Sequence, residues 1–376
     1  MDPALLTIPA YQPIPFPAPL WLLKTLLVVT FLLHVIPMNV ALGGSFVSGL
    51  LLALSGGDRQ TFAGRFGHAL AVGLPVFVSF ALTFGVAPLL FLQLVYGPMY
   101  YTSSLLMAAP WLGVLLLVMG GYYGCYIYKL NYLKLGARAG WLMIGVSVLF
   151  ALVALTFTSN MVFMLSPEKW QAVLAGNLHG LYFYWEDPQQ LPRYLHFVLA
   201  ALAVTGLAMG CFGLYWHGRE RAYGEWLIKT GAGVFGAITL VQVGVGGWFL
   251  MSLPHATMMN FMGGDTLGTA VFGVAMLCSV VALLAAVISW KDGRPGPMKI
   301  AVGAAVLVIG MMSWMRHLLR EYTIGAVIHP ELVPVKTQWD LLIVFVLSAV
   351  ALIVYLVWLA RVAWQGLLND APASQP

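Results

Sequence analysis

Three histidines stand inside or at the edge of long apolar runs of the sequence. His34 lies in VVTFLLHVIPMN, His196 in RYLHFVLAALAV and His317 in MMSWMRHLLREY. An imidazole inside a membrane is costly unless it is paired, and haem iron is one partner that suits its neutral form. All three are therefore candidate metal ligands. The alternatives are a structural hydrogen bond for His34 and His196, and an exposed basic cap for His317, which has Arg316 and Arg320 beside it.

Four further side chains could take part in a haem site. Met315 offers a thioether axial ligand, although a methionine is more often a gap filler in a core. Arg316 and Arg193 could pair with haem propionates, because a guanidinium group binds a carboxylate through two hydrogen bonds. Snorkelling to the membrane interface is the alternative for both. His68, three residues after Arg65, is a candidate ligand whose alternative is an interface or packing role.

A possible quinone site follows the sixth apolar run. The stretch GVGGWFLMSLPHATMMNFMGGD, residues 244–265, joins a small-residue face to an aromatic pair and a proline break. A flat amphipathic quinone could dock there among Trp248, Phe249 and His255. Gln93, in another run that ends near the same surface, could hydrogen-bond a quinone headgroup. An ordinary aromatic belt is the alternative for all of these residues.

The elements that carry these residues must be membrane helices. Of the 376 residues, 61% are hydrophobic and only 8% are charged, whereas about 25% of a soluble protein is charged. The expected fold is an all-α polytopic transmembrane bundle of about nine helices. The apolar segments lie at about 22–54, 67–96, 104–128, 139–163, 192–216, 227–251, 267–290, 298–318 and 340–364.

The same pattern predicts the limits of the transmembrane domain and of the segments that flank it. Residues 1–21 read as an extended proline-rich lead-in, residues 22–366 as a single transmembrane helical domain, and residues 367–376 as a disordered tail. In the connection at 164–191, the stretch SPEKWQAVL predicts a short helix at the surface. Pro37, Pro75 and Pro88 fall inside predicted helices, where kinks are expected.

The basic residues predict an orientation. Twelve of the 18 lysines and arginines fall in one set of alternate connections and six in the other. By the positive-inside rule the N-terminus lies outside and the C-terminus in the cytoplasm. The expected location is the bacterial inner membrane.

Several classes of protein are disfavoured. All 13 acidic residues lie in connections or at helix ends, whereas proton-coupled transporters usually place a carboxylate within the membrane. Cys125, Cys211 and Cys278 stand alone, and no C-x-x-C-H motif for covalent haem is present.

The pattern resembles the large haem-bearing subunit of bd-type quinol oxidases, which has nine helices and an N-terminus on the outer side of the membrane. The resemblance implies haem ligands at His34 in the first helix and His196 in the fifth. GGWF at 246–249 resembles the quinol-side region, and SWMRHLL at 313–319 resembles the segment with the remaining low-spin ligand, Met315 or His317. The G-R-Q-P-W signature and the acidic residues of the third helix are missing, and the quinol loop is reduced to about 15 residues.

Together these features predict a distant relative that carries b-type haem and passes electrons on, without acting as a terminal oxidase. It would exchange electrons between a quinol pool and an external cytochrome or redox subunit, as a possible quinol-oxidising part of an oxidoreductase complex. The alternatives are a haem-free quinone-binding membrane anchor and, less favoured, a transporter.

Overall fold

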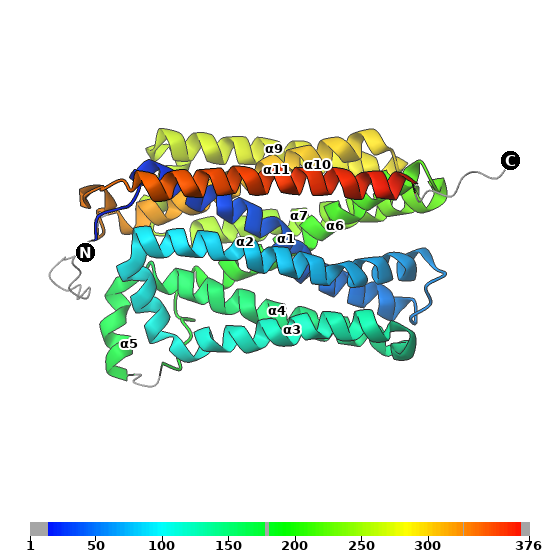
Figure 1. Ribbon diagram of the computed structural model, residues 1–376, viewed down its shortest axis with the longest axis horizontal. Helices are drawn as coiled ribbons and strands as arrows, with labels where there is room; N and C mark the ends of the chain where they lie inside the picture. Colours follow the sequence, from blue (N-terminus) through cyan, green and yellow to red (C-terminus); the bar gives the residue numbers. More distant parts are fainter. Residues whose placement is uncertain (1–13, 177–179, 326, 370–376) are drawn as a thin grey trace. The chain divides into compact units, whose positions relative to one another are not determined.

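The computed structural model describes residues 14–176, 180–325 and 327–369 (Figure 1). These divide into two units, treated separately here: residues 24–329 form most of the first, and residues 14–23 and 330–369 form the second. The domain boundaries expected at 21 and 366 stay predictions. Residues 1–13 of the predicted lead-in and 370–376 of the predicted tail lie outside the described residues.

The all-α fold class is confirmed. The described residues form the helices α1 Leu20–Leu54, α2 Phe62–Leu106, α3 Ala108–Leu135, α4 Arg138–Phe163, α5 Trp170–Gly176, α6 Gln190–His217, α7 Arg221–Met251, α8 His255–Met259, α9 Thr266–Asp292, α10 Pro295–Ile324 and α11 Trp339–Asn369. Of the described helices, eight (α1–α4, α6, α7, α9 and α10) are long and apolar enough to cross a membrane. α11 covers the ninth predicted segment, and α5 is the short helix predicted in SPEKWQAVL.

Local signals explain several helix ends. Thr61 caps α2 by accepting a hydrogen bond from Gly64 N. Asp265 caps α9 in the same way through Gly268 N, and α9 ends at Gly293, whose left-handed backbone favours glycine. The backbone of α2 leaves helical angles at Tyr96. Pro98 follows two residues later and has no N–H to donate, so a distortion forms here.

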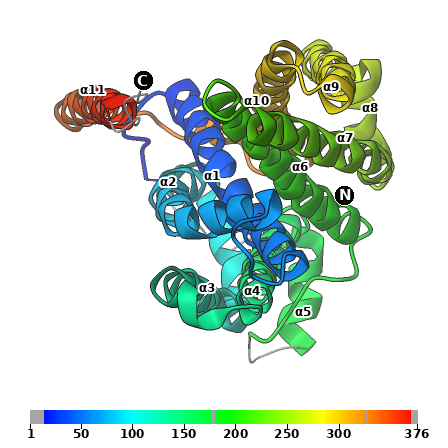
Figure 2. The same ribbon diagram turned by 90° about the vertical axis from the view of Figure 1, so that its right-hand side faces the viewer.

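In the first unit α1 is the central helix, between α2 and α6 (Figure 2). Three glycines let it approach its neighbours closely. A methyl group at Gly43 would overlap the carbonyl oxygen of Ala201 in α6, while Gly49 lies against Gly140 in α4 and Gly44 against Leu74 in α2. Small residues at helix contacts allow this backbone approach in membrane proteins. α3 packs on α4, α6 on α7, and α9 on α10.

The second unit joins the start of the described chain to the segment before α11. Phe16 and Val335 form a parallel bridge, in which Phe16 N donates to Pro334 O at 2.8 Å and Lys336 N to Phe16 O at 2.9 Å. Proline-rich chain is extended, and a short pairing satisfies its remaining backbone groups.

The ends of α1, α2, α6, α7 and α10 that carry the candidate site residues other than His68, with the neighbouring ends of α4 and α9, are called the outer ends below, after the predicted orientation. That orientation stays a prediction.

We expect Gly43→Ala to lower the stability of the first unit by about 1–3 kcal/mol, the usual cost of overpacking a tight core. The added methyl group meets backbone, which cannot move aside as a flexible side chain can. Gly145→Ala is the matched control, because no atom lies within 4 Å of its added methyl group. Thermal unfolding in detergent measures both variants. Equal melting temperatures would show that the α1–α6 contact is not tight.

Candidate functional site

Three arginines gather at the outer ends of α6 and α10. Arg193 and Arg320 are buried, with 5% and 6% of their surface exposed. Arg316 lies four residues before Arg320, on the same face of α10, and its Nε is buried. Arg316 is close enough to Arg193 and Arg320 for their charges to interact. The outer ends of these two helices therefore share one concentrated positive charge.

Each arginine packs on an aromatic ring. The Cζ atom of Arg316 lies 4.0 Å from the ring centroid of Phe31, that of Arg193 lies 5.7 Å from Phe249, and Arg320 lies over Tyr96. Such contacts recover only about 0.5–2 kcal/mol each. Among the described residues, no carboxylate forms an ion pair with any of the three arginines.

Two guanidinium nitrogens in this cluster have no hydrogen-bond partner. They are the Nη1 atom of Arg193 and the Nε atom of Arg316, both buried. A buried charge that lacks its partner costs about 3–5 kcal/mol. The cluster therefore has the chemistry of a binding site for a group with more than one negative charge.

The one carboxylate in the middle of this region is already engaged. Glu321 accepts a hydrogen bond from Lys24 Nζ at 2.6 Å and another from the hydroxyl of Tyr96. These contacts tie α10 to α1 and α2. Glu321 therefore pairs with Lys24, and although its charge also reaches Arg320, the three arginines keep an excess of positive charge.

The ring of His34 makes a hydrogen bond of the kind that orients metal-binding histidines. Its Nδ1 lies 2.8 Å from the carbonyl oxygen of Ala81 in α2. A carbonyl oxygen only accepts, so Nδ1 carries the proton and Nε2 keeps its lone pair. Gly85 faces the ring, and a methyl group there would lie 2.9 Å from it. The charge of Arg316 reaches His34, so α1 joins the arginine cluster.

His196 lies on the other side of the cluster, against α7. Its Nδ1 is buried and has no partner. Gln242 lies 3.5 Å from its Nε2, at the limit of a hydrogen bond. Gly246 faces the ring and leaves it room, since a methyl group there would come within 3.2 Å. The ring of Phe249, which also contacts Arg193, lies 6.4 Å from the His196 ring between centroids.

Met315 and His317 have different neighbours. Met315 packs against the apolar cluster of Leu253, Phe261, Leu318 and Leu319, and Phe249, whose ring lies near His196, packs against the same cluster. The Nδ1 of His317 is buried without a partner, and its nearest charges include Lys24 and Glu321. The structure thus places His317 near the Lys24–Glu321 pair, while Met315 packs against the apolar cluster that Phe249 also contacts.

His68 lies apart from these residues, at the opposite end of α2. Its Nδ1 lies 2.8 Å from the hydroxyl of Tyr128, and its ring packs on Tyr132. A ligand role for His68 stays a prediction, and any such role would belong to a different site.

The predicted quinone residues are not joined by contacts among the described residues. Gln93 accepts a hydrogen bond from the hydroxyl of Tyr101, eight residues along α2. Trp248 and His255 are exposed, while Phe249 packs on Arg193 and His196. Their role in binding quinone stays a prediction.

Sequence reasoning missed Gln190. This residue begins α6, three residues before Arg193, and only 1% of its surface is exposed. Neither its amide oxygen nor its amide nitrogen has a partner. No local signal distinguishes it in the sequence, because glutamine at a helix start is ordinary. Its burial next to Arg193 marks it as a further polar group of the cluster.

Among the described residues, no three His, Cys, Asp or Glu side chains gather to hold a metal ion. A haem iron takes only one or two ligands from protein side chains. The donors present are single imidazoles and one thioether, with arginines nearby. This set of donors fits a haem.

The fold can be compared with known proteins. A chain of the structure titled "The structure of bd oxidase from Geobacillus thermodenitrificans" aligns with a TM-score of 0.72, over 93% of this chain and 98% of that chain. The resemblance to a bd-type oxidase is confirmed as a likeness of fold. The identity is 13%, at which the likeness shows the fold alone. No family model and no curated protein matches the sequence.

The outer turn between α7 and α9 is fixed by one carboxylate. Asp265 accepts hydrogen bonds from the hydroxyl of Tyr322 at 2.6 Å and from Gly268 N at 2.7 Å. These bonds lower the pKa of Asp265. Because that pKa is lower in the folded than in the unfolded protein, the anchoring is complete above about pH 4 and is lost as the pH falls through the folded pKa.

A spin label at Met259→Cys should therefore gain mobility only below about pH 4. Tyr322→Phe removes the larger cause of the low pKa, so we expect the mobile state to appear at a higher pH. Electron paramagnetic resonance measures the mobility, and Tyr101→Phe serves as control. A pH profile that Tyr322→Phe leaves unchanged would contradict this anchoring.

Proposed function

We propose that this chain is a membrane-embedded electron-transfer subunit that binds b-type haem at the outer ends of α1, α6 and α10. It takes electrons from quinol and passes them to an external cytochrome or redox subunit, in the bacterial cytoplasmic membrane. The observation that carries the proposal is the unbalanced arginine cluster. The likeness of fold to a bd oxidase chain supports it.

The arginines are suited to haem propionates. Two propionates carry two negative charges, and Arg193 and Arg316 each have a buried nitrogen without a partner. Charge-assisted hydrogen bonds between guanidinium and carboxylate are among the stronger ones in proteins. Gln190 supplies an amide beside Arg193 for the same purpose.

The iron ligands that fit best are His34 and His196. His34 presents Nε2 as its free donor atom because Ala81 holds Nδ1, and each ring packs against a glycine where a larger residue would collide with it. Met315 is the candidate partner for His196, since it packs on the same apolar cluster as Phe249, whose ring lies near His196. His317 is the alternative that the sequence left open.

The haem, when bound, supplies a one-electron carrier within the membrane. The protein residues hold and tune it. Buried positive charge near a redox centre favours the reduced form and raises its potential. Phe31 and Phe249, packed on the arginines, keep water away from the cluster and strengthen these electrostatic effects.

Purified protein should show a reduced-minus-oxidised α-band in the visible spectrum. His196→Ala should remove at least one haem, because the buried ring supplies an iron ligand that alanine lacks. His255→Ala is the matched control, since His255 is exposed at the outer turn. Folding is checked by size-exclusion chromatography. A well-folded but colourless wild-type protein would exclude haem and leave the haem-free quinone-binding anchor.

Arg316→Gln should lower the midpoint potential of the bound haem by on the order of 60 mV, a tenfold step in a one-electron equilibrium. The reason is the loss of one buried positive charge. Redox titration followed in the visible spectrum measures the potential. Arg219→Gln, an exposed arginine at the other end of the bundle, should leave it unchanged. An equal shift in both variants would argue against a local effect of Arg316.

A further inference from the structure

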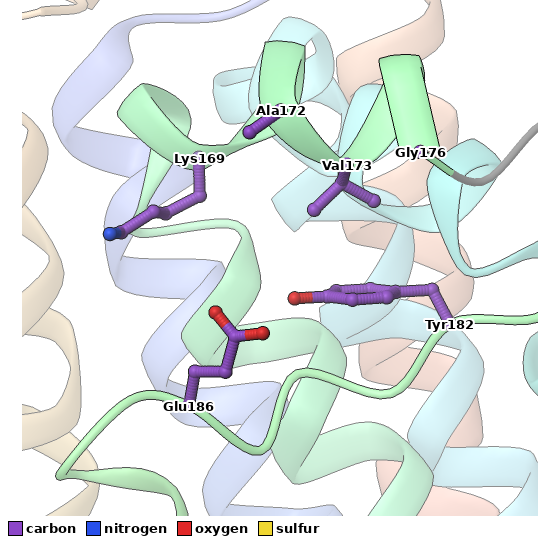
Figure 3. Close-up of a pocket in the computed structure, with 6 residues that line it drawn as sticks. All are labelled: Lys169, Ala172, Val173, Gly176, Tyr182 and Glu186. Atoms are coloured by element: carbon purple, nitrogen blue, oxygen red, sulfur yellow. The ribbon is translucent and has the colours of Figure 1, made fainter.

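The connection between α4 and α6 forms a pocket that no step of the proposed function uses. Its volume is about 290 Å³. α5 and the 3₁₀ turn before it form one wall, and the extended segment before α6 forms the other (Figure 3). The lining residues are Lys169, Ala172, Val173, Gly176, Tyr182 and Glu186.

The pocket holds two opposite charges that do not neutralise each other. Lys169 and Glu186 lie on opposite walls and form no ion pair with each other. Neither side chain has a hydrogen bond to another described residue. Figure 3 shows the Glu186 carboxylate and the Tyr182 hydroxyl directed into the same space. The lining of the pocket therefore includes a cation, an anion and a hydroxyl.

An aromatic ring and an aliphatic side chain bound the same space. Val173 projects from α5 toward the face of the Tyr182 ring (Figure 3). That ring is fixed by packing on Phe163, 5.3 Å away between centroids. Burial and the nearby charge of Glu186 raise the pKa of Tyr182, so its hydroxyl keeps its proton and can donate. A flat ring with polar substituents fits these surroundings.

Three apolar residues that are next in sequence to residues lining the pocket are exposed. Leu174, Leu181 and Trp185 are 55%, 72% and 55% exposed. Exposed leucine and tryptophan on a short surface helix and loop are typical of a membrane interface. A ligand with an apolar tail could keep that tail against these exposed side chains while its headgroup enters the pocket.

The pocket also leads to the arginine cluster. Asp187 follows Glu186 directly, and its charge reaches Arg193. Asp187 also accepts a hydrogen bond from Gln189 N at 2.8 Å, which fixes the chain at the start of α6. The segment that forms the pocket thus continues directly into the helix that carries the proposed haem ligand.

We propose that this pocket binds the headgroup of a quinol, an inference that rests on the proposed function. The ring packs between Tyr182 and Val173, and Glu186 accepts a hydrogen bond from one quinol hydroxyl, while the ammonium group of Lys169, on the same side of the Tyr182 ring as Glu186 (Figure 3), attracts that oxygen. The site lies in the 164–191 connection, separate from the outer turn at 252–266.

The test is calorimetric titration of the full chain in detergent with a decyl-tailed benzoquinol under anaerobic conditions, and with the corresponding quinone. Glu186→Gln should weaken quinol binding about tenfold, the loss expected for one charge-assisted hydrogen bond. It should affect the quinone much less, because a quinone oxygen has no proton to donate to Glu186. Lys169→Met should weaken both ligands. Glu168→Gln, an exposed carboxylate of the same connection that does not line the pocket, is the matched control.

A selective loss of quinol affinity in Glu186→Gln supports the pocket, since a misfolded connection would weaken both ligands equally. Equal quinol affinity in Glu186→Gln and Glu168→Gln, or no quinol binding by the wild-type chain, overturns it. The titration needs no haem. A colourless protein whose Glu186→Gln variant selectively loses quinol affinity would contradict the haem proposal and support the quinol pocket. A haem-containing protein whose Glu186→Gln variant keeps its quinol affinity would support the haem proposal and contradict the pocket.

Discussion

The repulsion among Arg193, Arg316 and Arg320 is the constraint on which the outer half of the first unit depends. Three guanidinium groups are held close together without a carboxylate ion pair among the described residues. Stacking on Phe31, Phe249 and Tyr96 offsets only part of the cost. Such an arrangement is stable when an anionic group completes it, and the histidines around it have the free nitrogen atoms that haem iron needs.

The helices bring this cluster together through glycine contacts. Gly43 sets the distance between α1 and α6, while Gly85 and Gly246 let the rings of His34 and His196 pack against α2 and α7. The same helices carry structural and functional residues a few turns apart. The Lys24–Glu321 pair, which joins α1 to α10, fixes the outer end of α10 and so the direction of Arg316 and Arg320.

Much of the fold follows from the sequence, because long apolar segments have few alternatives to helices in a membrane. The nine predicted segments coincide with α1–α4, α6, α7 and α9–α11, although α2 extends ten residues beyond its predicted end to Leu106. Tertiary pairs were harder to predict. Lys24 and Glu321 are 297 residues apart, and Gln190 gives no local signal. Nor does spacing alone show that Met315 packs into an apolar cluster while His317 lies near Lys24. The pocket at Lys169 and Glu186 depends on a loop conformation that residue periodicity does not encode.

The most direct test of the account is an electron cryomicroscopy structure of the purified chain at side-chain detail. The account predicts a flat macrocycle between the outer ends of α1, α6 and α10, with its carboxylates on Arg193 and Arg316 and its iron on His34 or His196. A structure in which the three arginines contact only lipid phosphate or water, and both imidazoles are satisfied by protein hydrogen bonds, would contradict it.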